Sequence, residues 1–110
     1  MAIERIKQAH LWERDEHDWY VEPIECSRAL FDAIEFDGTV WDPACGLGRI
    51  VKSARDYGLD AIGTDLVSRA EICMSEKDFL KDDMIKGFSH IVSNPPFRFA
   101  EEFVRHSLKI

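Results

Sequence analysis

Four consecutive residues, Asn94-Pro95-Pro96-Phe97, combine the side chains most specific for chemistry in this sequence. Proline lacks a backbone N–H and pushes the preceding residue towards extended geometry, so we expect a rigid corner with carbonyl oxygens that can accept. Asn94 adds a side-chain acceptor, and Phe97 adds a flat apolar face. Two fixed acceptors beside an aromatic face suit a planar amino group, because they would return electron density to its nitrogen. The alternative is a plain proline turn with a buried phenylalanine.

A second motif joins Gly46 and Gly48 with the later residue Asp65. The glycines permit a tight turn and a close approach to a ligand, and the helix that follows favours an anionic group. An acidic residue about 20 positions after such a loop commonly accepts hydrogen bonds from ribose hydroxyls. Either feature alone could be structural. Together they predict an adenosine-bearing ligand.

The main alternative for this loop is an enzyme that binds a nicotinamide dinucleotide. Its fingerprint has a third glycine three positions after the second, where the helix packs closely against a strand. That position is Val51 in this chain. The sequence therefore argues against the dinucleotide class.

Alternating helices and strands are expected to position these motifs. Such alternation predicts an α/β domain with a parallel sheet and helices on its faces, and ligands then bind beyond the carboxyl ends of the strands. Every motif named above follows an expected strand. The expected helices cover residues 2–12, 23–37, 47–57 and 99–108, and the strands cover 39–41, 61–64, 72–74 and 91–93.

Composition restricts the class of protein. The net charge of −7 argues against this segment gripping nucleic acid by itself, because phosphate binding needs a basic face. We expect Cys26, Cys45 and Cys73 to be unpaired thiols in a reducing cytoplasm, and no metal site. No apolar run approaches the roughly 20 residues of a membrane span. These features predict a cytoplasmic protein that is not embedded in a membrane.

The motifs resemble those of class I S-adenosylmethionine-dependent methyltransferases. Within that family they look like the amino-methylating branch that includes N6-adenine DNA methyltransferases, and the motif order is similar to one subgroup with phage-borne members. The resemblance extends from Tyr20 to the end of the chain. It implies a three-layer Rossmann-like fold, S-adenosylmethionine as cofactor, and catalysis at Asn94, Pro95, Pro96 and Phe97.

The resemblance also assigns contacts with the cofactor. The segment around the two glycines would surround the methionine part, and Asp65 with Leu66 would hold the ribose. Asp78 and Phe79 look like the pair that contacts the adenine ring. The implied cofactor-binding residues are Tyr20, Pro23, Asp42, Pro43, Ala44, Cys45, Gly46, Gly48, Asp65, Leu66, Asp78 and Phe79. Residues 20–23 are similar to the family's upstream motif, which closes over the methionine end of the cofactor. The family more often has a hydroxyl residue there, where this chain has Glu22.

The family's sheet has seven strands, whereas this chain stops after the helix that follows the catalytic motif. The resemblance implies a strand order of 3-2-1-4, with residues 91–93 at an open edge. We therefore expect residues 1–110 to form a single, incomplete domain that self-associates or pairs with a chain completing the sheet.

The expected activity is methyl transfer to an exocyclic amino group, with adenine N6 in DNA as the leading substrate. Target recognition would need regions outside this chain. Two alternatives stay open. One is methylation of RNA or of a protein glutamine amide, and the other is a cofactor-binding fragment without activity alone.

Overall fold

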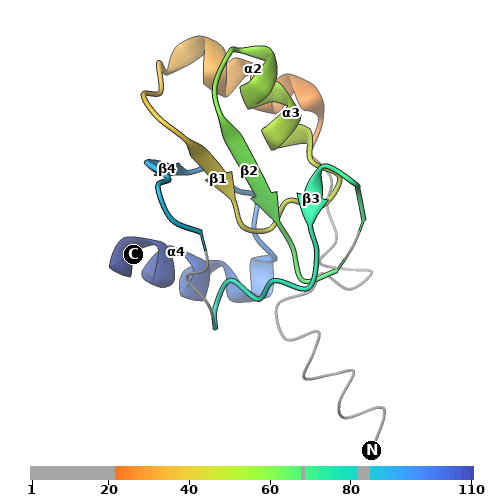
Figure 1. Ribbon diagram of the computed structural model, residues 1–110, viewed down its shortest axis with the longest axis vertical. Helices are drawn as coiled ribbons and strands as arrows, with labels where there is room; N and C mark the ends of the chain where they lie inside the picture. Colours follow the sequence, from red (N-terminus) through yellow and green to blue (C-terminus); the bar gives the residue numbers. More distant parts are fainter. Residues whose placement is uncertain (1–21, 68, 82–84) are drawn as a thin grey trace, which may run out of the picture.

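The computed structural model describes residues 22–67, 69–81 and 85–110. The helix expected at residues 2–12 and the predicted site residue Tyr20 lie outside these ranges. Figure 1 shows how the described elements are arranged. They are α2 (Ile24–Ala33), β1 (Val40–Asp42), α3 (Arg49–Asp56), β2 (Ala61–Thr64), β3 (Cys73–Met74), β4 (His90–Ile91), the 3₁₀ turn η1 (Phe97–Phe99) and α4 (Ala100–Lys109).

The four strands form one parallel sheet in the order β3-β2-β1-β4. Trp41 at the centre of β1 pairs with Ile62 on one side and with Ile91 on the other. Parallel strands need crossover connections, and α3 provides the one between β1 and β2. The predicted α/β class and strand order are confirmed.

Helices cover both faces of the sheet, and Figure 1 shows α2 and α3 together above it and α4 below. Successive residues of a strand point to opposite faces. Val40 therefore packs with Phe31 and Val51 in one apolar core. Trp41 packs with Phe79 and Phe103 in the other. The sheet is thus the middle layer of three.

Trp41 anchors the second core. Its side chain is fully buried, and its ring meets that of Phe79 edge to face at a centroid distance of 5.2 Å. Its Nε1–H donates to Thr64 Oγ1 over 3.0 Å, so the polar atom of the indole is satisfied. Burying a large apolar side chain stabilises a fold by about 1.5–3 kcal/mol. This pair therefore ties β1, β2 and the α4 side of the sheet together.

Several element bounds differ from those expected. Helix α2 ends at Ala33, before residue 37, because Ile34 is extended and Phe36 turns back to stack edge to face on Phe31. Helix α3 begins at Arg49, because the left-handed φ of +82° at Gly48 lies outside the helical region. The longest described helices have 10 residues, and none of the described helices could cross a membrane.

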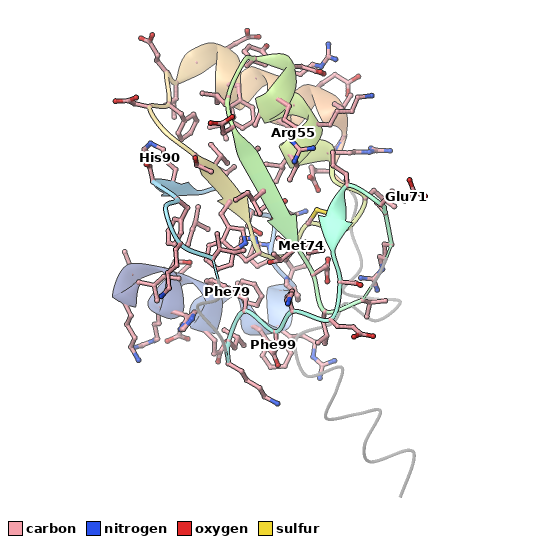
Figure 2. The ribbon with its side chains drawn as sticks, in the orientation of Figure 1. Arg55, Glu71, Met74, Phe79, His90 and Phe99 are labelled. Carbon is pink, nitrogen blue, oxygen red and sulfur yellow. A yellow bond between two sulfur atoms is a disulfide. The ribbon has the colours of Figure 1, made fainter. Side chains whose placement is uncertain are left out.

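The expectation of three unpaired thiols is wrong for two of them. Cys45, which follows β1, and Cys73 in β3 are joined as a disulfide, the yellow bond beside β3 in Figure 2. Cys26 is an exposed free thiol. The Cα atoms of Cys45 and Cys73 lie 6.2 Å apart, within the range that a disulfide bridges. The loop after β1 is therefore fixed to the edge strand β3.

Candidate functional site

The predicted motifs meet at the carboxyl edge of the sheet. The loop of residues 43–48 follows β1, Asp65 follows β2, and the corner of residues 94–97 follows β4. Because β1 lies between β2 and β4, the loop is flanked by Asp65 on one side and by the corner on the other. The structure thus brings together the two motifs that the sequence predicted to act together.

Two left-handed glycines shape the loop. Gly46 has a φ of +57° and Gly48 a φ of +82°, conformations that other residues rarely adopt. The N–H of Gly48 donates to Cys45 O over 2.8 Å, which closes the turn. The N–H of Lys52, in the first turn of α3, donates to Gly48 O. The loop therefore leads directly into α3, as the sequence predicted.

Close packing of α3 on the sheet comes from a glycine in the strand. A Cβ atom placed on Gly63 of β2 would overlap Cys45 and the side chain of Val51. The room that a third glycine provides in the helix of dinucleotide-binding enzymes is therefore supplied here from β2. This exchange accommodates valine at position 51 without moving the helix away from the sheet.

Asp65 is bonded to the loop itself. Its Oδ2 accepts the N–H of Gly46 over 2.7 Å, its Oδ1 accepts the N–H of Leu66, and Arg69 lies 4.0 Å away. The side chain is only 3% exposed, and burial raises its pKa against the opposing effects of Gly46 and Arg69. A carboxylate has about four acceptor positions, so ribose hydroxyls could still be accepted. Asp65 therefore holds the loop, and its contact with a ribose stays a prediction.

Asp42 connects the loop to the corner. Its Oδ1 accepts the N–H of Ala44 over 3.1 Å and the hydroxyl of Ser93 over 2.7 Å. The residue is 1% exposed. Burial raises its pKa to about 7, helped by the nearby charges of Glu22 and Asp65 and opposed by the two hydrogen bonds. One buried carboxyl group therefore binds a residue of the loop and the residue that immediately precedes the corner.

The corner is held by the side chain of Asn94 and by the backbone oxygen of Pro96, which accepts the N–H of Phe99 over 3.0 Å. Pro95 and Pro96 have no N–H to donate, and Pro96 is buried. Asn94 donates from Nδ2 to Glu22 Oε2 over 3.1 Å. Phe97 begins η1 and is 60% exposed, so the alternative of a buried phenylalanine in a plain turn is wrong. A rigid corner with an accessible aromatic ring results.

The two residues expected to contact an adenine ring, Phe79 and Asp78, lie in different surroundings. Phe79 is fully buried between Trp41 and Phe103, as the ring labelled near α4 in Figure 2 illustrates. Asp78 accepts the N–H of Leu80 through Oδ1. Phe79 therefore contributes to the core, and its contact with adenine stays a prediction. Pro23, expected in the first turn of a helix, caps α2 and is exposed.

Three contributing residues were not among the predicted site residues. Ser93 binds Asp42, Glu22 binds Asn94, and Arg49 donates from its guanidinium to the backbone oxygen of Glu22 over 3.0 Å. Ser93 immediately precedes the corner, and Glu22 departs from the family pattern. These two features of the sequence could have pointed to Ser93 and Glu22. Arg49 gave no such signal, because its partner is a backbone atom of another segment.

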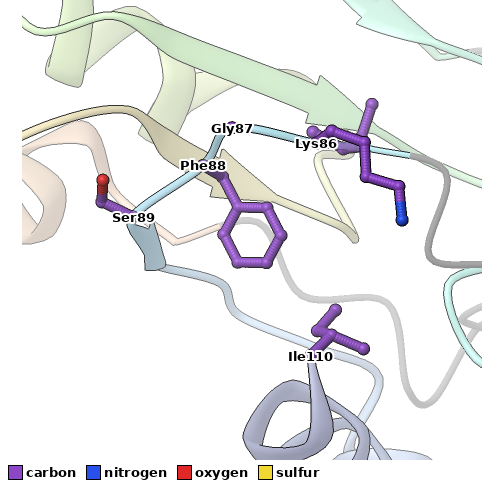
Figure 3. Close-up of a pocket in the computed structure, with 6 residues that line it drawn as sticks. Lys86, Gly87, Phe88, Ser89 and Ile110 are labelled. Carbon is purple, nitrogen blue, oxygen red and sulfur yellow. The ribbon is translucent and has the colours of Figure 1, made fainter.

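Two open cavities lie at the opposite end of the sheet. One, of about 360 Å³, is lined by Lys86, Phe88 and Ser89 before β4 and by Ile110 after α4 (Figure 3). The other, of about 420 Å³, lies beside Tyr57 at the end of α3. The loop and the corner follow the strands at their carboxyl ends. Neither cavity therefore belongs to the candidate site.

The chemistry of the site rests on carboxylates, an amide and an aromatic ring. Within residues 22–67, 69–81 and 85–110, no three His, Cys, Asp or Glu side chains come together as a metal site would require. No protein-family model matches the chain, and no curated protein matches its sequence.

Proposed function

We propose that this chain is an S-adenosylmethionine-dependent methyltransferase that acts on an exocyclic amino group, with adenine N6 in DNA as the substrate. One observation carries the proposal. The glycine loop and the Asn94 corner follow neighbouring strands, and the buried carboxyl group of Asp42 binds both Ala44 in the loop and Ser93, which immediately precedes the corner. A cofactor at the loop would place its reactive end beside an amino group held at the corner.

The loop suits the cofactor chemically. Asp65, which accepts the N–H of Gly46, offers carboxylate oxygens for hydroxyl hydrogens, and left-handed Gly46 and Gly48 let the backbone come close to a ligand. Asp78 would accept amino hydrogens of the cofactor's adenine, as the resemblance implies. The bound cofactor would supply a methyl carbon on a positively charged sulfur. Its methyl group would pass to the amino nitrogen, which would lose a proton to water, while the electron pair of the C–S bond would stay on sulfur.

The corner's contribution is positioning. Asn94 and the carbonyl oxygen of Pro95 would accept the two amino hydrogens, and Phe97 would stack on the ring that carries the amine. Because Phe97 is 60% exposed, a base extruded from a helix could reach it. Fixed acceptors lower the barrier by holding the nitrogen in line and stabilising its developing charge.

The proposal includes a partner for the free edge of the sheet. Among the described strands β4 pairs only with β1, and exposed Val104 and Leu108 lie on α4 nearby. Unpaired strand edges and apolar patches favour association. We therefore propose a second copy or another chain at this edge, and DNA contacts supplied by basic regions elsewhere, because the net charge is −7. The cytoplasm is the proposed location.

A transfer assay tests the function. The chain is incubated with cofactor labelled on its methyl group and with unmethylated DNA, RNA or mixed protein, and the products are analysed by mass spectrometry. We expect N6-methyladenine in DNA. Label in RNA or in a protein glutamine would show that methyl transfer occurs but that the substrate is not adenine in DNA. If the chain binds the cofactor but transfers label to none of the three substrates, the result would support a cofactor-binding fragment and contradict methyltransferase activity for this chain.

A further inference from the structure

The amide of Asn94 is oriented by a carboxylate 72 residues away in the sequence. Asn94 donates from Nδ2 to Oε2 of Glu22 over 3.1 Å, and both residues are half-buried. Glu22 is itself held from the helix side, because Arg49 donates to its backbone oxygen over 3.0 Å. The carboxylate is therefore part of a chain of contacts from α3 to the corner.

A carboxylate distinguishes the two ends of an amide. Ionised glutamate only accepts hydrogen bonds, whereas an asparagine side chain has a donor NH2 end and an acceptor oxygen end. If the amide of Asn94 were reversed, its oxygen would face the carboxylate oxygen of Glu22, and the two acceptors would repel. Glu22 thus selects the orientation in which the NH2 end faces it and the oxygen end faces away.

That selection determines which substrates the corner can accept. Pro95 and Pro96 contribute no N–H, so their backbone offers only carbonyl oxygens, and the orientation of Asn94 decides whether its side chain accepts from the substrate or donates to it. With its oxygen outward, the amide accepts from an amino group. With its NH2 outward, it would donate to a keto oxygen, as presented by guanine or hypoxanthine.

We propose that Glu22 is a positioning residue that holds the Asn94 amide with its oxygen towards the substrate, and thereby selects an amino-bearing base over a keto-bearing one. This inference rests on the proposed function for its substrate class. It assigns a task to a residue where the resembled family more often has a hydroxyl group. A hydroxyl group can donate or accept, and so could not fix the orientation of an amide in this way.

Glu22→Gln is the informative variant, because glutamine keeps the size of the side chain but can present either a donor or an acceptor to Asn94. We expect turnover on adenine-containing DNA to fall on the order of tenfold, the value of about one charge-assisted hydrogen bond. An oligonucleotide with hypoxanthine at the target position should inhibit the variant several-fold better than the native protein, relative to adenine. Exposed Glu25 in α2 supplies the matched control, and Glu25→Gln should change neither measurement.

A merely structural role would lower turnover without changing the preference between adenine and hypoxanthine, and that result would overturn the proposal. The side-chain amide resonances of Asn94, the only asparagine in the sequence, provide a readout that does not depend on activity. They should shift in Glu22→Gln and stay in place in Glu25→Gln. Absence of methyl transfer in the native protein would refute the proposed function alone. Unshifted Asn94 resonances would refute the role of Glu22.

Discussion

The glycine loop and the Asn94 corner lie at the same edge of the sheet but are held in different ways. The loop is held by its own backbone, whose N–H groups at Ala44 and Gly46 donate to the carboxylates of Asp42 and Asp65. The corner has two prolines without N–H groups, and the Glu22 side chain holds it from outside through Asn94. The loop is buried except at Leu47, whereas the corner presents Phe97 to solvent.

This difference follows from what each region would have to do. A cofactor is always the same molecule, so a rigid, buried backbone cradle suits it. A substrate base arrives as part of a polymer, so its site has to be open, with a few oriented groups. Asp42, at the end of β1, links the two regions, because it accepts hydrogen bonds from Ala44 in the loop and from Ser93 beside the corner.

The largest expected effect concerns Asp42 and pH. Its folded-state pKa of about 7 lies above the ordinary 3.8, so the folded state holds a proton that the unfolded state releases between these values. Stability from this group is complete below about pH 4 and is lost as pH rises through 7, by up to about 4 kcal/mol. Urea unfolding of native protein and Asp42→Asn from pH 4 to 8 measures the difference.

We expect Asp42→Asn to gain stability relative to the native protein as pH rises over that interval. Asp60→Asn, at an exposed aspartate before β2, is the control and should track the native protein. A difference between native protein and Asp42→Asn that stays constant with pH would show that Asp42 does not titrate in this way.

The second effect separates the corner from the loop. Asn94→Ala removes a preorganised acceptor and should lower turnover about 100-fold or more, which corresponds to about 2.7 kcal/mol. Single-turnover methyl transfer under saturating cofactor is the measurement. Ser89→Ala, at the other end of β4, is the control. Turnover within a factor of two of native would remove Asn94 from the mechanism.

A smaller effect is expected at Phe97. Stacking of a base on an aromatic ring contributes about 1–3 kcal/mol, so Phe97→Ala should weaken binding of substrate DNA correspondingly and leave the melting temperature nearly unchanged. Fluorescence anisotropy with a labelled oligonucleotide measures it. Ile34→Ala, at a 49% exposed residue that follows α2, is the control. Equal affinity of Phe97→Ala and native protein would contradict stacking.

The sequence was sufficient for the fold and for the meeting of the predicted motifs at one edge of the sheet. Alternating elements imply a parallel sheet, and residues after strands meet at one edge, so Gly48, Asp65 and Asn94 could be placed together before any coordinates. Bounds were less predictable. The left-handed conformation of Gly48 delays the start of α3, and the aromatic contact between Phe31 and Phe36 accompanies an early end of α2.

The groups that hold the corner could not be predicted, because they depend on contacts between distant segments. Ser93 and Asp42 are 51 residues apart, and Asn94 and Glu22 are 72 residues apart. No local pattern encodes such pairs. Phe79 shows the same limit, since its residue type fits an adenine pocket as well as it fits the buried core where it lies.

The central claim is that the loop binds the cofactor and the corner acts on the substrate. Calorimetric titration of the native protein, Asp65→Ala and Asn94→Ala with S-adenosylhomocysteine, the demethylated cofactor, tests it most directly. Thermal melting first establishes that each variant is folded. We predict that Asp65→Ala loses about 1–3 kcal/mol of binding free energy, while Asn94→Ala binds within about twofold of native. Equal affinity of native protein and Asp65→Ala, or a comparable loss in Asn94→Ala, would contradict this division of roles.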